Sequence, residues 1–170
     1  MSGSEALSLA NATLGSTAEL ALWLRASAGS GSDHVDGLAL RLPDFLELRS
    51  CVRELLEGAI AGGSLPAEAV ERLNETSARV PRIALLQGGS VSLTPIAGAG
   101  APLVLARISW SAMELVGGPE RDRLRRCGAC GRYFVATRPD RVWCSDRCGN
   151  RIRVARHHAR IRGPTYPVPG

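Results

Sequence analysis

Lysine is absent from this chain of 170 residues, and aromatic residues are scarce, with three Trp, two Tyr and two Phe. All 21 basic residues are therefore arginine, whose planar guanidinium suits phosphate and carboxylate partners. A GC-rich genome would favour arginine as well, and the two explanations have equal weight. The chain is 45% hydrophobic and 22% charged, which predicts a soluble globular protein with one compact domain and a small satellite.

Long apolar runs are also missing. The longest uncharged segment, 83–106, is long enough to span a bilayer, but it contains several glycines and two prolines, which favour turns. The first arginine is Arg25, so the N-terminus has no basic region of the kind that begins an export signal. We therefore expect a cytoplasmic protein with no membrane partner.

Charge is divided unevenly along the chain. Residues 1–119 contain 8 arginines and 12 acidic residues, a net charge of −4, whereas residues 120–170 contain 13 arginines and 4 acidic residues, a net charge of +9. Such an asymmetry predicts two functional parts, the second of which binds polyanions.

The first part carries helical patterns up to residue 77. Ser16 and Glu19 have the spacing of a capping box, which predicts a helix start. The elements expected here are two short helices within 4–28 separated at Gly15, a loop over 29–36, a long helix over 43–61 and a further helix capped by Ser64.

A change of period follows. The β-favouring runs 82–87 and 91–96 are separated by Gly88, Gly89 and Ser90, which predicts a hairpin. Helical spacing returns over 102–116, and two glycines and a proline end that helix just before the charge balance changes.

Five cysteines in a chain without an export signal imply reduced thiols, so four of them close together predict a metal site. Cys127 and Cys130 form a Cys-x-x-Cys pair, each followed by a glycine that permits the positive φ of a tight turn. Cys144 and Cys148 are four residues apart, on one side of a first helical turn. Together they predict one structural Zn²⁺, because four thiolates leave no open position for water. A redox switch that releases zinc on oxidation is the alternative.

The segment between the two cysteine pairs predicts a second hairpin, with a strand over 133–135, a turn over 138–140 and a returning strand at Val142 and Trp143. A knuckle, a hairpin and a helix around one zinc ion make a treble clef. The predicted fold class is α+β, with a mostly helical domain containing one hairpin over 1–118, a treble-clef-like zinc finger over 119–163 and a flexible tail over 164–170.

These residues also carry a family resemblance. The segment 126–151, with Trp-Cys-Ser at 143–145 and Cys-Gly-Asn-Arg at 148–151, resembles the CGNR zinc finger that closes a family of bacterial proteins described as stress-induced transcription regulators. The apolar opening at 7–11, and the segments 48–55 and 120–126 after it, resemble the ABATE domain of that family. The resemblance implies a regulator that binds DNA and whose first domain senses a ligand or a partner.

Arginines line the helix expected after the cysteines. Cys148, Ile152, Ala155 and Ala159 fall on one stripe at helical spacing, which predicts a core-facing seam between two arginine flanks. We interpret the flanks as a DNA interface that grips phosphates. The alternative is a solvated face that pairs with the acidic first part. The candidate nucleic-acid-binding residues are Arg147, Arg151, Arg153, Arg156, Arg160 and His157.

Several residues allow two interpretations. Trp143 can be either a lid that packs over the metal site or a platform on which a base stacks. Asn150 and Arg151 can either brace the finger through hydrogen bonds or contact DNA. Cys51 is a small core residue or a sensor thiol. The sequence contains no Ser-His-Asp set, no carboxylate pair with an obvious cleft and no phosphate-cradling glycine loop, so we expect no enzyme.

The leading functional prediction is a zinc-binding, DNA-binding transcription regulator whose finger docks through the arginine-rich helix. The alternative is a structural or protein-interaction zinc module that meets an acidic protein partner. The residues leave open the ligand of the first domain, the DNA sequence and the oligomeric state.

Overall fold

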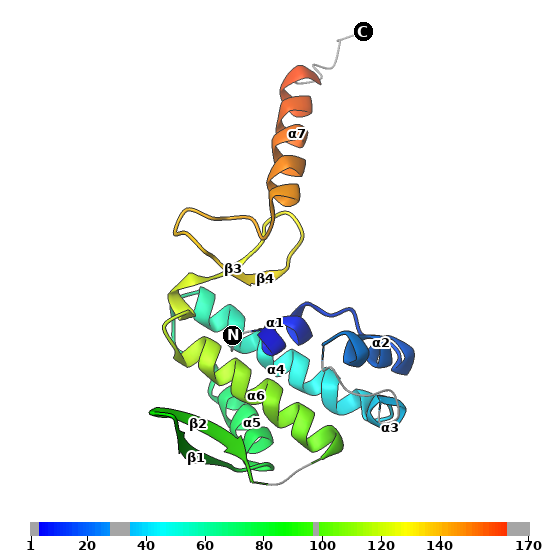
Figure 1. Cartoon of the computed structure of the whole chain (residues 1–170). Helices are drawn as coiled ribbons and strands as arrows, with labels where there is room; N and C mark the ends of the chain where they lie inside the picture. Colours follow the sequence, from blue (N-terminus) through cyan, green and yellow to red (C-terminus); the bar gives the residue numbers. More distant parts are fainter. Residues whose placement is uncertain (1–3, 28–34, 97–98, 163–170) are drawn as a thin grey trace. The chain divides into compact units, whose positions relative to one another are not determined.

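The computed structural model describes residues 4–27, 35–96 and 99–162. The chain divides into two compact units, Met1–Asp122, which we call the helical unit, and Arg123–Gly170, which we call the finger (Figure 1). The tail predicted over 164–170 and residues 29–34 of the predicted loop lie outside the described residues. The observed elements are α-helices and two antiparallel hairpins, as the α+β prediction requires.

The helical unit contains the helices that the sequence patterns predict. Two short helices flank Gly15, one long helix follows, and the helical pattern after the first hairpin is also a helix. The bounds are α1 (Ser4–Asn11), α2 (Thr17–Ser27), α3 (Val35–Ala39), α4 (Leu42–Ile60), α5 (Ala67–Ala78) and α6 (Gly100–Gly117), with a short 3₁₀ helix, η2 (Arg121–Arg123), at the boundary between the units.

The core of this unit surrounds α6, which lies against α1, α4 and α5 (Figure 1). Phe45 and Leu55 on α4 and Ile108 and Leu115 on α6 are fully buried. Each such side chain contributes about 1.5–3 kcal/mol to folding. The amphipathic stripe that the sequence shows on α4 is therefore the face that packs against the other helices.

Polar contacts attach α1 to the two long helices. The Arg53 guanidinium donates to the Ala10 carbonyl at 2.8 Å, which satisfies an acceptor in the last turn of α1. On the other side, the Ala6 amide donates to the Ser111 hydroxyl of α6 at 3.2 Å, and Arg107 forms an ion pair with Glu5. The N-terminal helix is thus part of the core and is held on two sides.

The start of α2 confirms the predicted capping box. The Glu19 amide donates to the Ser16 hydroxyl at 3.2 Å, and the Glu19 carboxylate accepts from the Gly15 amide at 2.7 Å. The first bond satisfies an amide that a helix start leaves without an intrahelical partner, and the second ties the Glu19 side chain to the residue before Ser16.

Two expectations for this unit are wrong in detail. Ser64 does not cap α5, because that helix begins at Ala67 and its N-cap position is Pro66, which has no side-chain acceptor. The loop expected up to residue 36 is shorter, since α3 already begins at Val35, a residue that is fully buried. Burial of that side chain favours helix there over loop.

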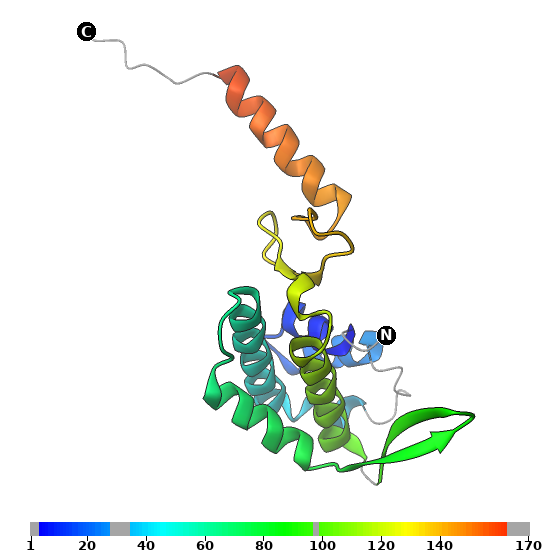
Figure 2. The same ribbon diagram turned by 90° about the vertical axis from the view of Figure 1, so that its left-hand side faces the viewer.

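The first hairpin pairs β1 (Arg82–Gln87) with β2 (Ser90–Pro95) in antiparallel register. Gly88 and Gly89 form the two-residue turn with φ values of 55° and 81°, a left-handed geometry that glycine adopts without strain. At the other end of the hairpin, the Arg82 guanidinium stacks 4.3 Å from the Trp110 ring centre on α6. The hairpin is thus attached to the helices at its base, and its turn projects beyond them (Figure 2).

The finger contains β3 (Leu124–Arg126), β4 (Tyr133–Val135) and α7 (Asp146–Arg162). The prediction that 133–135 pairs with Val142 and Trp143 is wrong, because β4 pairs with β3 instead. The Arg141 guanidinium donates to the carbonyls of Trp143 and Cys144 at 3.0 and 3.1 Å. These bonds hold that segment in an irregular loop and occupy acceptors that a strand ladder would use.

Among the described residues, no helix is both long enough and apolar enough to cross a membrane.

Candidate metal centre

The first cysteine pair lies in the turn that joins β3 to β4. The carbonyl of Cys127 accepts from the amides of Cys130 and Gly131 at 3.3 and 2.7 Å, and the Cys127 amide donates to the Arg132 carbonyl at 2.9 Å. Gly131 has a φ of 74°, as the tight-turn prediction requires. The turn places both sulfur atoms of the pair on the same side.

The second cysteine pair lies at the start of α7. The Ser145 hydroxyl accepts from the Cys148 amide at 3.3 Å and so acts as the N-cap of the helix, with Asp146 in the first turn. Cys144 precedes the helix and Cys148 lies in its first turn. A capped helix start thus fixes the distance between these two ligands.

All four sulfur atoms lie within 4.8 Å of one another. The Sγ atoms of Cys130 and Cys144 are 3.5 Å apart, and those of Cys144 and Cys148 are 3.7 Å apart. A tetrahedron with Zn–S bonds of about 2.3 Å has sulfur atoms about 3.8 Å apart. The cluster therefore fits one Zn²⁺ bound by Cys127, Cys130, Cys144 and Cys148, and none of these cysteines forms a disulfide.

The protein environment shifts the pKa values of two ligands in opposite directions. Burial raises the pKa of the Cys127 thiol, but hydrogen bonds from the backbone of Cys144, Ala129 and Cys130 outweigh burial and bring it down to about 6. Burial, then hydrogen bonds to the neighbouring cysteines and the charge on Cys127, raise the pKa of Cys144 to about 12. Four thiolates at this distance repel one another, and a bound Zn²⁺ supplies the positive charge that all four need.

Trp143 packs against two glycines of the ligand segments. A Cβ atom added at Gly149 would lie 3.2 Å from the Trp143 ring, and one added at Gly128 would lie 3.3 Å from it. The indole is therefore held between the knuckle and the first turn of α7. This placement favours the lid interpretation of Trp143, and it changes the role of Gly128, which provides space for the ring and has no positive φ.

Two further arginines support the ligand loops. The Arg151 guanidinium donates to the Ala129 carbonyl in the knuckle, which favours the bracing interpretation of that residue. Arg141, which sequence reasoning missed, holds the loop before Cys144 through the two carbonyls described above. No local pattern marks Arg141, because its acceptors belong to a loop without regular structure.

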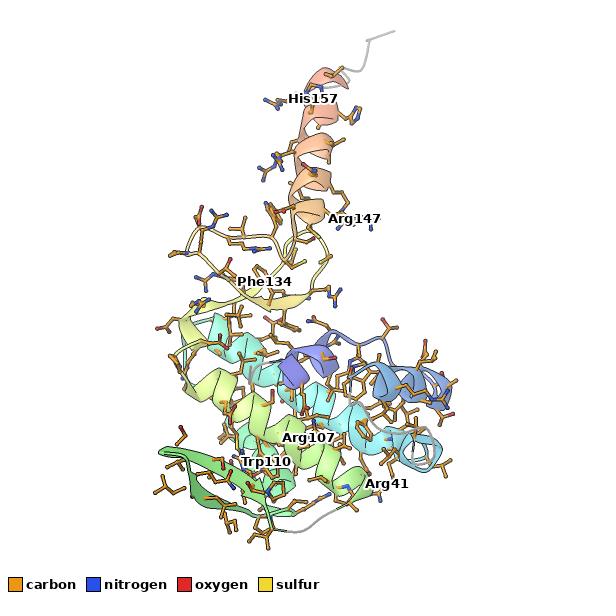
Figure 3. The ribbon with its side chains drawn as sticks, in the orientation of Figure 1. Arg41, Arg107, Trp110, Phe134, Arg147 and His157 are labelled. Atoms are coloured by element: carbon orange, nitrogen blue, oxygen red, sulfur yellow. The ribbon has the colours of Figure 1, made fainter. Side chains whose placement is uncertain are left out.

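The candidate nucleic-acid-binding residues lie on the surface of α7. Arg147 is in the first turn and His157 is nearer the other end of the helix (Figure 3). The predicted core-facing seam is wrong beyond Ile152, since Ala155 and Ala159 are exposed. The helix extends past the metal site, and no other described segment of the finger covers this second half. All six candidates are exposed: Arg147, Arg151, Arg153, Arg156, Arg160 and His157.

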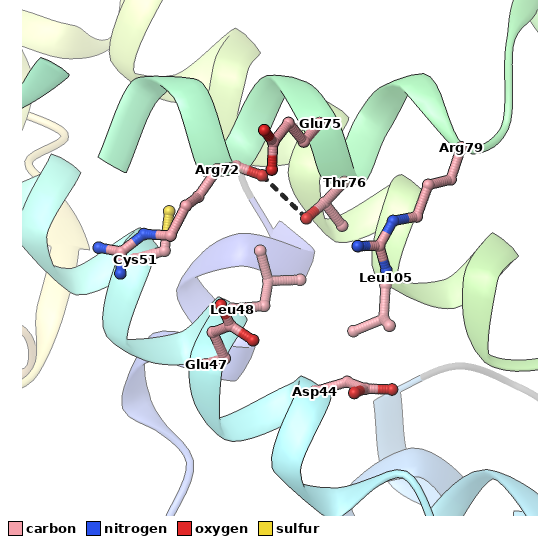
Figure 4. A pocket seen from close by; sticks show the side chains of 9 residues that line it. All are labelled: Asp44, Glu47, Leu48, Cys51, Arg72, Glu75, Thr76, Arg79 and Leu105. Atoms are coloured by element: carbon pink, nitrogen blue, oxygen red, sulfur yellow. Dashed lines mark hydrogen bonds between the residues drawn. The ribbon is translucent and has the colours of Figure 1, made fainter. Parts of the chain in front are cut away.

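The helical unit contains a separate small pocket of about 100 Å³ (Figure 4). Its lining combines acidic side chains such as Glu47 and Glu75 with the basic side chains of Arg72 and Arg79. The Cys51 thiol also lies at this pocket, is 1% exposed and donates to the Ala69 carbonyl at 3.0 Å. Cys51 is therefore a buried core residue, as one of its two interpretations states.

The fold and the site define a zinc-finger protein in which a helical unit precedes a small finger with one structural Zn²⁺. Comparison with protein families agrees with the resemblance seen in the motifs. The ABATE family, described as "Putative stress-induced transcription regulator", matches residues 3–119, and the CGNR zinc finger matches residues 123–161. The chain therefore belongs to the ABATE family and carries a CGNR zinc finger. No curated protein matches it.

Proposed function

We propose that the protein is a transcription regulator that binds duplex DNA through α7. The observation that carries this proposal is a helix whose exposed arginines have no acidic partner within the described residues of the finger. No carboxylate of that part lies within ion-pair distance of Arg147, Arg156 or Arg160. Since unpaired guanidinium groups favour anionic partners, the helix suits the phosphates of a nucleic acid.

One flank of α7 is the stronger candidate for phosphate contacts. Arg153, Arg156 and Arg160 follow one another at three- and four-residue spacing, and they line a shallow surface depression together with Ala159. With a rise of 1.5 Å per residue, the flank extends over about 10 Å. Three arginines on one side of a helix over this length suit successive phosphates of one strand.

The opposite flank has a different character. Arg147 is exposed, but Arg151 is bound to the Ala129 carbonyl and so supports the knuckle. Arg151 is therefore a weaker candidate for reading a base than for holding the finger in shape, and we assign base reading to no residue of this flank.

The experiment that tests the proposal measures DNA affinity against salt. Fluorescence anisotropy with the zinc-loaded full chain and a labelled random-sequence duplex should give a log–log slope of roughly −3 to −4 if about four phosphates are neutralised. Arg156→Ala should weaken binding to all sequences alike and reduce the slope by about one. Arg79→Ala, which removes an exposed arginine of the helical unit, serves as the control and should leave the slope unchanged.

The absence of salt-sensitive binding at low ionic strength would contradict the proposal. A second candidate function then takes its place, a protein-interaction module with an acidic partner. The observation that favours it is the exposure of Val154 and Ile161 on the face of α7 opposite the predicted seam, since apolar side chains contribute nothing to phosphate binding.

The proposal gives the helical unit a regulatory role and assigns the protein no enzymatic activity. The zinc centre has four protein ligands and therefore no position for a substrate or an activated water. The pocket at Cys51 is small and lined by charges of both signs, so it suits a small polar ligand or an ordered water cluster.

A further inference from the structure

The hairpin β1–β2 exposes apolar side chains on a surface that belongs to no core. Antiparallel register places the pair Ala84 and Leu93 on the same face as the pair Leu86 and Val91. Leu86 is 76% exposed, Val91 69% and Leu93 53%. Globular proteins usually leave such side chains exposed singly, whereas here they form a continuous patch on one side of a two-stranded sheet.

The apolar face of the hairpin also has no charged residue that would repel the same face of a second chain. No Asp, Glu, Lys or Arg occurs between Ile83 and Ala106. At the base of the hairpin, the Arg82 guanidinium stacks on the Trp110 ring and lies 3.9 Å from the Glu114 carboxylate. A partner of either charge gains no electrostatic attraction from this surface, whereas an identical neutral surface meets no repulsion.

Both strands of this hairpin are edge strands, because within the described ranges of the chain the sheet consists of β1 and β2. Antiparallel pairing uses every second residue of a strand, so the remaining backbone N–H and C=O groups point outward. Proteins commonly protect such edges with charged side chains, prolines or bulges. In β1 and β2 the only such feature besides Arg82 is Pro95 at the end of β2, and most of each edge is left open.

We propose that the apolar face of this hairpin, formed by Ala84, Leu86, Val91 and Leu93, is the contact by which two copies of the chain associate. A two-fold axis brings the same neutral face of each copy together and places two open strand edges near each other. A standard interface takes about 800 Å² from each partner. A hairpin of two six-residue strands offers less area, so the association is weak, with a dissociation constant in the micromolar range.

The test is the oligomeric state of the zinc-loaded full chain, measured by analytical ultracentrifugation from low micromolar to several hundred micromolar protein. The wild-type chain should form dimers as its concentration rises. The double variant Leu86→Arg, Val91→Arg places like charges on both copies and should weaken association by at least about tenfold. Leu40→Arg changes a side chain of equal exposure, 76%, that lies outside the hairpin, and should dimerise like the wild type.

Circular dichroism melts of each variant check that the helical unit remains folded, as expected for changes at exposed positions. A wild-type chain that stays monomeric over the whole concentration range overturns the proposal. The apolar face would then be a binding surface for a different protein. The proposal also fails if the double variant dimerises as well as the wild type. If Leu40→Arg weakens dimer association as much as the double variant does, the effect is due to net charge, and the proposal is overturned.

Discussion

Cys51 and the four cysteines of the finger are the same residue type in opposite environments. The finger cysteines meet one another and a metal, whereas Cys51 lies in the helical core and donates to a carbonyl. Burial raises the pKa of the Cys51 thiol, so a smaller fraction of it is thiolate at any given pH than for an ordinary cysteine. This environment makes Cys51 a poor candidate for a rapid redox sensor.

We therefore predict that thiol titration at pH 8 finds Cys51 unreactive in the native, zinc-loaded protein. Chelation should release four reactive thiols and denaturation a fifth, and the reaction of Cys51 should become faster as pH rises and the thiolate forms. Cys51→Ala should remove only the thiol that appears on denaturation. If it removes a fast-reacting thiol of the native protein, the sensor interpretation is correct.

At the scale of elements, the start of α2 is stabilised by its own first residues. Ser16 and Glu19 exchange hydrogen bonds with the amides at this end, and the side chains lie on the surface. The cap therefore acts locally, and its contribution can be measured without disturbing the core.

Ser16→Ala should lower the free energy of unfolding by about 1 kcal/mol. For a unit of this size that corresponds to a fall in Tm of about 4 °C. The measurement is thermal unfolding followed by circular dichroism, with Thr13→Ala, a change at an exposed position outside any helix, as the control. Equal shifts for the two variants would show that the capping bonds contribute nothing.

The helix α7 is an element whose two halves have different partners. Its first turn contains Cys148 and Gly149, which contact the other sulfur atoms and the Trp143 ring. From Arg153 onward its described side chains are exposed. The first half therefore depends on the metal centre for its position, and the second half is available for a partner.

At the scale of the whole molecule, the two units depend on different stabilising forces. The helical unit has a core of buried side chains that includes Phe45, Leu55 and Ile108. The finger has short strands and few buried apolar residues, so the zinc ion replaces the core that it lacks. Removal of the metal should affect the two units unequally.

We predict that chelation of zinc, or the change Cys144→Ser, unfolds the finger and leaves the helical unit folded. Calorimetry should show one metal-dependent transition that disappears and a second that remains near its original temperature. Ser145→Ala removes the N-cap hydroxyl next to that ligand and keeps all four thiols, so it should retain the metal. A Cys144→Ser protein with full zinc content would refute the ligand assignment.

Much of the site could be predicted because its ligands are paired locally. Cys127 and Cys130 share one turn, and Cys144 and Cys148 share one helix start, so their spacing reports their geometry directly. The helices over 4–28, 43–61 and 102–116 could be predicted for the same reason, since apolar spacing along a helix is a local pattern.

The errors arose where the partners are distant in sequence or in an irregular loop. The propensities of Val142 and Trp143 favour a strand, but the bonds from Arg141 hold them in a loop. The alanines of the predicted seam on α7 share the spacing of a buried face, yet no other described element of the finger covers them. Periodicity identifies a face and does not say whether another element packs on it.

The order of amino acids alone is enough to predict the four zinc ligands, the helical patterns of the first unit and the turn of the first hairpin, and it shows the excess of arginine after residue 119. These properties depend on residue type and on spacings of a few residues, which the chain carries before it folds. The three-dimensional packing determines that β3 pairs with β4, that Trp143 lies between Gly128 and Gly149, and that Leu86 and Val91 are exposed. These features depend on which segments pack together in the folded chain. Where packing against a segment distant in sequence conflicts with local secondary-structure propensity, the packing contributes more to stability and determines the structure.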